Sequence, residues 1–142
     1  MDPRISIITL GVEDFQTAYR FYKKGLGFQT KNGPDDQIAF FQLRGIVLAI
    51  YPLEKLAEDI APDVPGEKPK FSGTTLAHNV MKKEEVDSLL AKAEAAGGRI
   101  VKPGQNTFWG GYSGYFADPE GYYWEVAYFD KWQYDQEGHL VL

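Results

Sequence analysis

Residues 5–28 read ISIITLGVEDFQTAYRFYKKGLGF, and this stretch contains the first strand and the first helix of the predicted fold. The apolar, β-branched run at 5–12 predicts a buried strand. From Phe15 onward, apolar side chains recur three and four positions apart, which is the spacing of one helix face. Gly25 and Gly27 end this helix, because glycine readily adopts the backbone conformation of a helix C-terminus. The stretch therefore predicts a strand followed by a helix.

The same order of elements recurs about 70 residues later, which indicates an internal repeat. The spacing from Phe15 to Gly27 in the first half equals the spacing from Val86 to Gly98 in the second half. Three further strands follow each helix, so the repeat predicts two modules of order β-α-β-β-β. The predicted strands are 5–12, 28–31, 38–43, 46–51, 74–80, 99–102, 112–117 and 122–128, and the second helix covers 84–96.

Residues 52–72 differ from both modules because they carry Pro62, Pro65 and Pro69 among scattered charges. We interpret them as a linker with a short helix over 53–59. In each module, the helix covers one face of the sheet and the other face needs a partner. Two modules placed side by side predict an open eight-stranded cup with the helices on the convex side, which is an α+β fold. The predicted boundaries within one domain, 1–142, are module one 4–51, linker 52–72, module two 73–130 and tail 131–142.

Composition excludes several classes of function. The chain has 142 residues, a net charge of −5 and 44% hydrophobic residues, which suits one globular domain. Its acidic balance without a basic stripe predicts no nucleic-acid partner. The absence of cysteine excludes disulfides, thiolate metal sites and a cysteine nucleophile. No run reaches the roughly 18 apolar residues of a membrane span, and no secretory pattern begins the sequence. We therefore expect a cytoplasmic protein with no membrane partner.

Two motifs, one in each half, carry a family resemblance. They are Leu10-x-Val12-x-Asp14 with Phe21-Tyr22 and Leu26-Gly27-Phe28, and Phe116-x-Asp118-Pro119-x-Gly121-x-x-x-Glu125. They resemble motifs of the vicinal oxygen chelate superfamily, which includes glyoxalase I, extradiol dioxygenases, fosfomycin resistance enzymes and bleomycin-binding proteins. The resemblance covers nearly the whole chain apart from the linker and the tail. It implies the fold and a homodimer, but the superfamily contains both enzymes and binding proteins.

The resemblance also implies four positions at which metal-dependent relatives carry His or Glu ligands. In this sequence they are Ile7, Ala49, Thr75 and Glu125. A divalent metal needs several charged or strongly polar donors, and isoleucine and alanine offer none. We therefore predict a divergent member with no metal at this site and no cofactor.

Alternation along the strands predicts which side chains line the cup. In module one, Phe40 is expected opposite Ala49 and Gln42 opposite Val47. In module two, counting back from the turn at 118–121 places Phe116 opposite Tyr123, Gly114 opposite Glu125 and Tyr112 opposite Ala127. The alternative is a filled core in which these rings pack on one another. The predicted ligand-binding residues are Ile7, Thr9, Phe40, Gln42, Ala49, Thr75, Asn79, Trp109, Tyr112, Phe116, Tyr123 and Glu125.

Three single residues each have two interpretations. Glu125 is either a general base or ligand acceptor with a raised pKa, or it is paired with a donor such as Thr75 or Tyr123. Trp109 is either a lid over a flat ligand or a ring that packs against the other half or a second subunit. His78 is either a substitute metal ligand or a structural histidine, and strand alternation favours the second because it directs His78 toward the helix side.

The combined prediction is a protein that binds a small apolar or aromatic molecule without a metal. One alternative is a metal-dependent lyase or dioxygenase of the glyoxalase type. Another is a metal-free enzyme with Glu125, the one predicted catalytic residue, as general base. The aromatic tail 128–134 adds support for a homodimer, because exposed rings are typical of interfaces.

Overall fold

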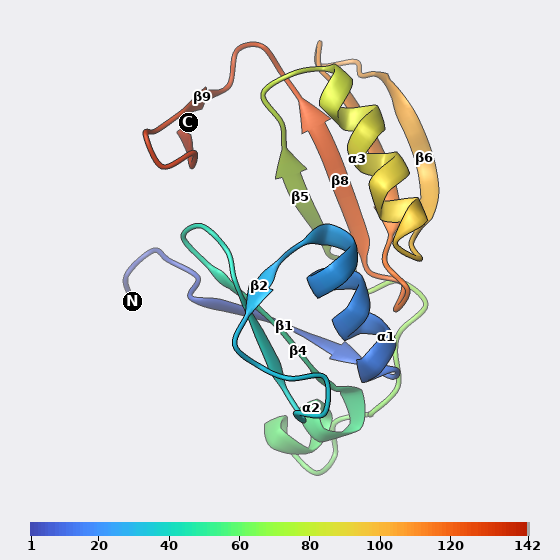
Figure 1. Cartoon of the computed structure of the whole chain (residues 1–142). Coiled ribbons are helices and arrows are strands. Elements are labelled where there is room, and N and C mark those ends of the chain that lie inside the picture. The colour runs from blue at the N-terminus through green and yellow to red at the C-terminus, as the bar shows by residue number, and fades with distance from the viewer. Residues whose placement is uncertain (142) are drawn as a thin grey trace. The chain divides into compact units, whose positions relative to one another are not determined.

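The computed structural model describes residues 1–141 and contains the same sheet topology twice (Figure 1). The strand orders are β1-β4-β3-β2 in the first sheet and β5-β8-β7-β6 in the second. In each sheet the first and last strands of the module pair in parallel, and the other pairs are antiparallel. The chain divides into one unit at residues 1–72 and a second that begins at Gly73. The predicted internal repeat and the α+β class are confirmed.

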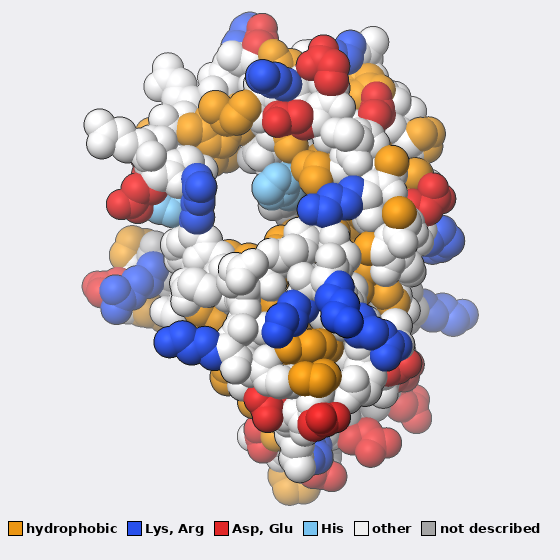
Figure 2. Space-filling model, in the orientation of Figure 1, with side chains coloured by type: hydrophobic (Ala, Val, Ile, Leu, Met, Phe, Trp, Pro, Cys, Tyr) orange, Lys and Arg blue, Asp and Glu red, His pale blue; other side chains and the backbone are white. Residues whose placement is uncertain are grey.

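The first unit follows the predicted order of elements. Asp14 begins the first helix by accepting a hydrogen bond from the backbone N–H of Thr17 at 3.0 Å. Gly27 ends the helical stretch in a left-handed conformation, at φ 84°. Basic side chains gather over this helix, as Figure 2 shows, and several occupy its C-terminal turns. The elements are β1 Ile7–Val12, α1 Phe15–Arg20, the π-helical η1 Phe21–Leu26, β2 Gln29–Thr30, β3 Ala39–Gln42, β4 Val47–Pro52 and α2 Leu53–Ile60.

Aromatic rings form much of the core between α1, η1 and the first sheet. Phe41 and Tyr22 are fully buried, and their ring centroids lie 5.7 Å apart. Tyr19 and Phe28 also face the Phe41 ring, at 6.2 and 6.4 Å. Phe41 therefore lies at the centre of a cluster contributed by three elements and the loop before β2.

The second unit repeats this arrangement with α3 across one face of its sheet (Figure 1). Val86, Leu90 and Ala93 form the buried stripe of α3. Strand β6 runs further than predicted and contains two register shifts against β7. A short C-terminal hairpin, β9–β10, was not predicted. The elements are β5 Thr75–Asn79, α3 Glu84–Ala95, β6 Arg99–Asn106, β7 Tyr112–Ala117, β8 Tyr123–Tyr128, β9 Gln133–Tyr134 and β10 Leu140–Val141.

The turn between β7 and β8 sets a register one residue away from the predicted one. The N–H of Asp118 donates to the carbonyl of Tyr122 at 2.9 Å, so the loop between these two residues contains only three residues. Gly121 at its end has φ 87°, as in three-residue hairpin loops that close with a left-handed residue. A shift of one residue moves a whole strand's side chains to the opposite face. The predicted pairings of β7 with β8 are therefore wrong.

The corrected register places two predicted site residues on the helix side of the sheet. Phe116 pairs with Trp124, and their rings are parallel within 4° at 6.0 Å. The hydroxyl of Tyr112 donates to Asp87 of α3 at 3.0 Å. The side chains of Phe116 and Tyr112 therefore do not share a face with Glu125. The residues that β7 contributes to that face are Ser113, Tyr115 and Ala117.

We expect Asp118→Ala to destabilise this turn. The buried carboxylate accepts hydrogen bonds from the backbone N–H groups of Glu120 at 3.0 Å and Tyr122 at 2.8 Å. Removing it leaves both donors without this acceptor and costs about 1–3 kcal/mol of unfolding free energy. Urea unfolding measures the loss. Asp118→Asn keeps one acceptor oxygen and is expected to lose less, and equal losses in the two variants would contradict the explanation.

Within residues 1–141, no helix combines the length and apolar character required to cross a bilayer.

Candidate functional site

The first sheet has one face opposite its helix that carries the predicted apolar residues. Register pairs Phe40 with Ala49 and Gln42 with Val47, so the predicted pairing in this module is confirmed. Thr9 pairs with Ala49 from the other side, and Ile7 lies two residues before Thr9 on the same face. Ile7 is 49% exposed and Phe40 is 40% exposed, whereas Ala49 is buried. This face therefore presents accessible hydrocarbon and ring surface with the polar Thr9 and Gln42 beside it.

The second sheet has a corresponding face opposite α3, and its composition is more polar. Parallel pairing of β5 with β8 sets Thr75 beside Tyr123 and Asn79 beside Ala127, which places these predicted residues on the face of Glu125. Tyr123, Glu125 and Asn79 are half-buried, and Thr75 is exposed. The Thr75 hydroxyl donates to the backbone oxygen of Tyr123 at 3.2 Å.

Glu125 has a hydrogen-bond partner that the sequence analysis missed. Tyr115 lies directly opposite it on β7, and the phenol donates a hydrogen bond to the carboxylate. Burial raises the pKa of Tyr115, and the negative charge of Glu125 together with this hydrogen bond raises it further. The phenol is therefore neutral at physiological pH and acts as a donor. The Thr75 hydroxyl, one of the partners considered from the sequence, donates to the backbone oxygen of Tyr123.

Lys102 extends this pair into a row across three strands. It pairs with Tyr115 from β6, and its ammonium nitrogen lies 5.9 Å from the centre of the Tyr115 ring. That distance is within the range of cation–π contacts. A cation, a phenol and a carboxylate therefore follow one another along adjacent strands. Lys102 was not among the predicted site residues.

Trp109 packs against the C-terminal segment of its own unit. Its ring is stacked on Trp132 at 5.8 Å and meets Phe129 edge-on at 5.4 Å. A Cβ atom at Gly111 would lie 1.7 Å from the Trp109 ring, so only glycine leaves space for this position of the indole. The partner is therefore the tail, which neither interpretation from the sequence included. A role of Trp109 as a lid stays a prediction.

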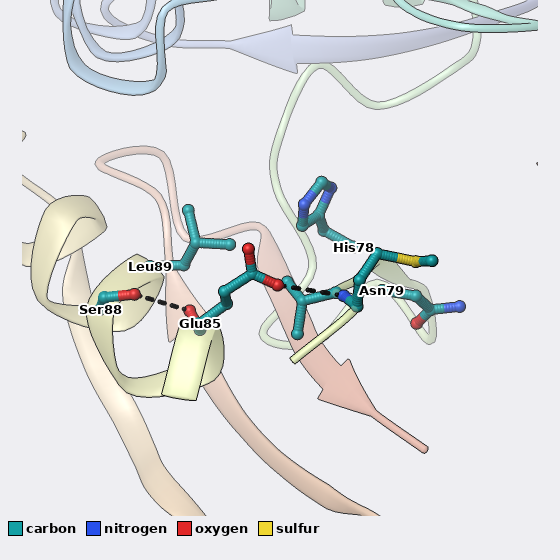
Figure 3. Close-up of a pocket in the computed structure, with 7 residues that line it drawn as sticks. His78, Asn79, Glu85, Ser88 and Leu89 are labelled. Atoms are coloured by element: carbon teal, nitrogen blue, oxygen red, sulfur yellow. Dashed lines mark hydrogen bonds between the residues drawn. The ribbon is translucent and has the colours of Figure 1, made fainter. Parts of the chain in front are cut away.

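A separate hollow of about 330 Å³ lies between the end of β5 and the start of α3 (Figure 3). His78 lies on the helix side of β5 as predicted. Glu85 accepts hydrogen bonds from the N–H groups of Met81 at 3.1 Å and Lys82 at 2.9 Å, so this carboxylate stabilises the start of α3. The lining residues are His78, Asn79, Val80, Met81, Glu85, Ser88 and Leu89.

We expect His78 to titrate below the ordinary histidine pKa of 6.5. Burial lowers its pKa, and the charge of Glu85 opposes this effect more weakly. The unfolded chain then binds more protons than the folded protein once the pH falls below about 6.5, so acidification through the folded pKa reduces stability. An NMR titration of the His78 ring should give a lower midpoint in the folded protein than in urea. A higher midpoint in the folded protein would contradict this assignment.

The side chains at the four implied ligand positions do not fit a divalent metal. In the first unit, Ile7 and Ala49 have no donor atoms. In the second, the Thr75 hydroxyl binds a backbone oxygen and Glu125 is the one carboxylate. Over the residues that the structure describes, no group of three or more His, Cys, Asp and Glu side chains could hold a metal ion.

Comparisons with known proteins agree with this fold. A sequence model described as the Glyoxalase/Bleomycin resistance protein/Dioxygenase superfamily matches residues 4–126. The crystal structure of a glyoxalase-related enzyme from Fulvimarina pelagi is 34% identical, with a TM-score of 0.87 over 99% of this chain and 98% of that one. No curated protein matches the chain.

Two further solved structures are similar at lower identity and support the fold alone. A glyoxalase/bleomycin resistance protein/dioxygenase from Nocardioides is 22% identical, with a TM-score of 0.77 over 92% of this chain and 86% of that one. A lactoylglutathione lyase from Agrobacterium tumefaciens is also 22% identical, with a TM-score of 0.69 over 95% of this chain and all of that one (100%).

Proposed function

This chain belongs to the glyoxalase/bleomycin resistance protein/dioxygenase superfamily, and from that premise we propose that it binds a small apolar or aromatic molecule without a metal at the four ligand positions. The observation that carries the proposal is the face of the first sheet opposite its helix. Ile7 and Ala49 have hydrocarbon side chains at two positions where the family resemblance implies metal ligands, and the exposed ring of Phe40 adjoins Ala49 on the neighbouring strand.

The second sheet gives a separate observation that suits the binding of a small molecule, because its own face carries a few polar groups. Sites for small molecules usually combine apolar lining with a small number of polar side chains that fix the ligand's orientation. Glu125, Tyr115 and Asn79 are half-buried polar groups on the face opposite α3.

The test is binding of N-phenyl-1-naphthylamine, a neutral aromatic probe whose fluorescence rises in apolar surroundings. We expect saturable binding in EDTA and the same affinity after addition of Zn²⁺ or Mn²⁺. Phe40→Ser should weaken binding by about tenfold, because it removes apolar contact area. Phe108→Ser is the matched control, since Phe108 is a fully exposed ring in the loop before β7.

Two outcomes would contradict the proposal. Absence of saturable binding in EDTA, together with binding that appears on metal addition, would favour a metal-dependent lyase or dioxygenase. Equal weakening by Phe40→Ser and Phe108→Ser would show that the probe detects exposed rings in general and not the face of the first sheet.

A further inference from the structure

We propose that Lys102, Tyr115 and Glu125 recognise a zwitterionic small molecule, whose ammonium group contacts Glu125 and whose carboxylate contacts Lys102. The inference goes beyond the proposed function, which is argued from the first unit, because it assigns a ligand with two charged groups to the second unit. The second unit alone contains all three residues.

The row is fixed by strand pairing on the face opposite α3. Lys102 pairs with Tyr115, and Tyr115 pairs with Glu125, so the two charged residues stand two strands apart. Their Cα atoms are therefore separated by about 10 Å. Gly114, the neighbour of Tyr115 on β7, identifies the face that is turned toward the helix. A Cβ added at Gly114 would lie 2.6 Å from the Leu90 side chain of α3. The three side chains of the row are thus directed away from the helix.

The charges of the row remain available to a ligand. Within residues 1–141, the Lys102 ammonium makes no salt bridge, and its contact is with the Tyr115 ring. Glu125 accepts a hydrogen bond from the Tyr115 phenol. A carboxylate has two oxygens and about four acceptor sites, so it can accept further hydrogen bonds from an ammonium group. Charge-assisted hydrogen bonds of this kind are among the strongest that proteins form.

The small side chains that β7 and β8 place beside the row are buried, so a ligand would contact the half-buried Lys102, Tyr115 and Glu125 themselves. Ser113 and Ala117 flank Tyr115 along β7, while Glu125 has Ala77 beside it on β5 and Tyr123 and Ala127 on either side along β8. On β7, the ring of Tyr115 therefore stands between two short side chains. An aromatic ligand body can lie against this ring while the long side chains of Lys102 and Glu125 extend to its two charged groups.

The experiment uses three probes that share one ring and differ in charge. L-Phenylalanine carries both groups, phenethylamine lacks the carboxylate, and 3-phenylpropionate lacks the ammonium group. Affinities are measured by NMR titration of the ¹⁵N-labelled full chain. We expect L-phenylalanine to bind about tenfold more tightly than either analogue, which corresponds to one charge-assisted contact for each missing group.

Two variants assign each charged group to its partner. Lys102→Gln should abolish the advantage of L-phenylalanine over phenethylamine and keep its advantage over 3-phenylpropionate. Glu125→Gln should have the reverse effect. Lys92→Gln is the matched control, because it removes an exposed lysine from α3 on the other side of the sheet, and it should leave all three affinities unchanged.

Failure of this inference is distinguishable from failure of the proposed function. Equal affinities for the three probes, with N-phenyl-1-naphthylamine still bound, would overturn the zwitterion site and leave the apolar site intact. The zwitterion site would also be overturned if Lys92→Gln changed the relative affinities of the three probes as strongly as Lys102→Gln does. Absence of binding by all four probes would overturn both proposals.

Discussion

Phe41→Ala is expected to lower the free energy of unfolding by about 3–5 kcal/mol, whereas Phe40→Ala should cost about 1 kcal/mol or less. The two phenylalanines are neighbours on β3, but alternation directs them to opposite faces. Phe41 is fully buried among Tyr19, Tyr22 and Phe28, and its removal leaves a cavity that these rings cannot fill. Phe40 is 40% exposed, so its truncation returns little surface to water.

Urea unfolding of both variants measures the difference, because the two substitutions delete the same atoms from adjacent positions. Equal losses would contradict the assignment of faces in the first sheet. A large loss for Phe40→Ala alone would reverse that assignment and would also remove the main support for an apolar ligand surface.

Gly114→Ala is expected to lower the free energy of unfolding by up to about 3 kcal/mol, the upper part of the usual range for overpacking. An added Cβ would lie 2.6 Å from Leu90 of α3, 2.8 Å from the carbonyl oxygen of Lys102 and 3.0 Å from the amide nitrogen of Gly104. Two of these atoms belong to the backbone of β6, which cannot move aside as a flexible side chain can. The glycine thus permits the close approach of β6 and α3 to β7.

The same substitution tests the register of β7, because the register predicted from the sequence directs position 114 away from α3. Gly33→Ala is the control, since an added Cβ there has no neighbour within 4 Å. Calorimetric melting of both variants gives the comparison. An unchanged melting temperature for Gly114→Ala would favour the predicted register over the observed one.

The two hairpins show how far the sequence alone determines the candidate site. In the first module, the N–H of Leu43 donates to the carbonyl of Ile46 at 3.1 Å across a two-residue connection. Alternation of side chains along the two strands, counted from this turn, gives the faces that the structure shows. In the second module, the turn contains four consecutive turn-forming residues from Asp118 to Gly121, and the sequence does not determine which of them joins the ladder. In the structure, Asp118 joins the ladder by pairing with Tyr122. This shift of one residue exchanges the two faces of β7.

Tyr115 and Lys102 were missed for two different reasons. The predicted register directed Tyr115 toward the helix, and no cross-strand pairing was predicted for the strand 99–102, which contains Lys102. The pairing of β6 contains two register shifts, and its backbone lies close to Gly114 of β7. Such tertiary contacts leave no periodic signal in the sequence, and the two-residue strands of the tail are too short to give one.

The stacked indoles of Trp109 and Trp132 have an optical consequence. Their rings are inclined by only 28° at 5.8 Å, whereas the third tryptophan, Trp124, stacks on a phenylalanine in the core. Two indoles at this separation couple their electronic transitions, and a chirally held pair produces a circular dichroism couplet. Trp132 lies in the C-terminal segment and Trp109 in the loop before β7, so the couplet exists only while these two segments are in contact. The chain therefore contains a built-in chromophore pair that reports the attachment of its own C-terminal segment.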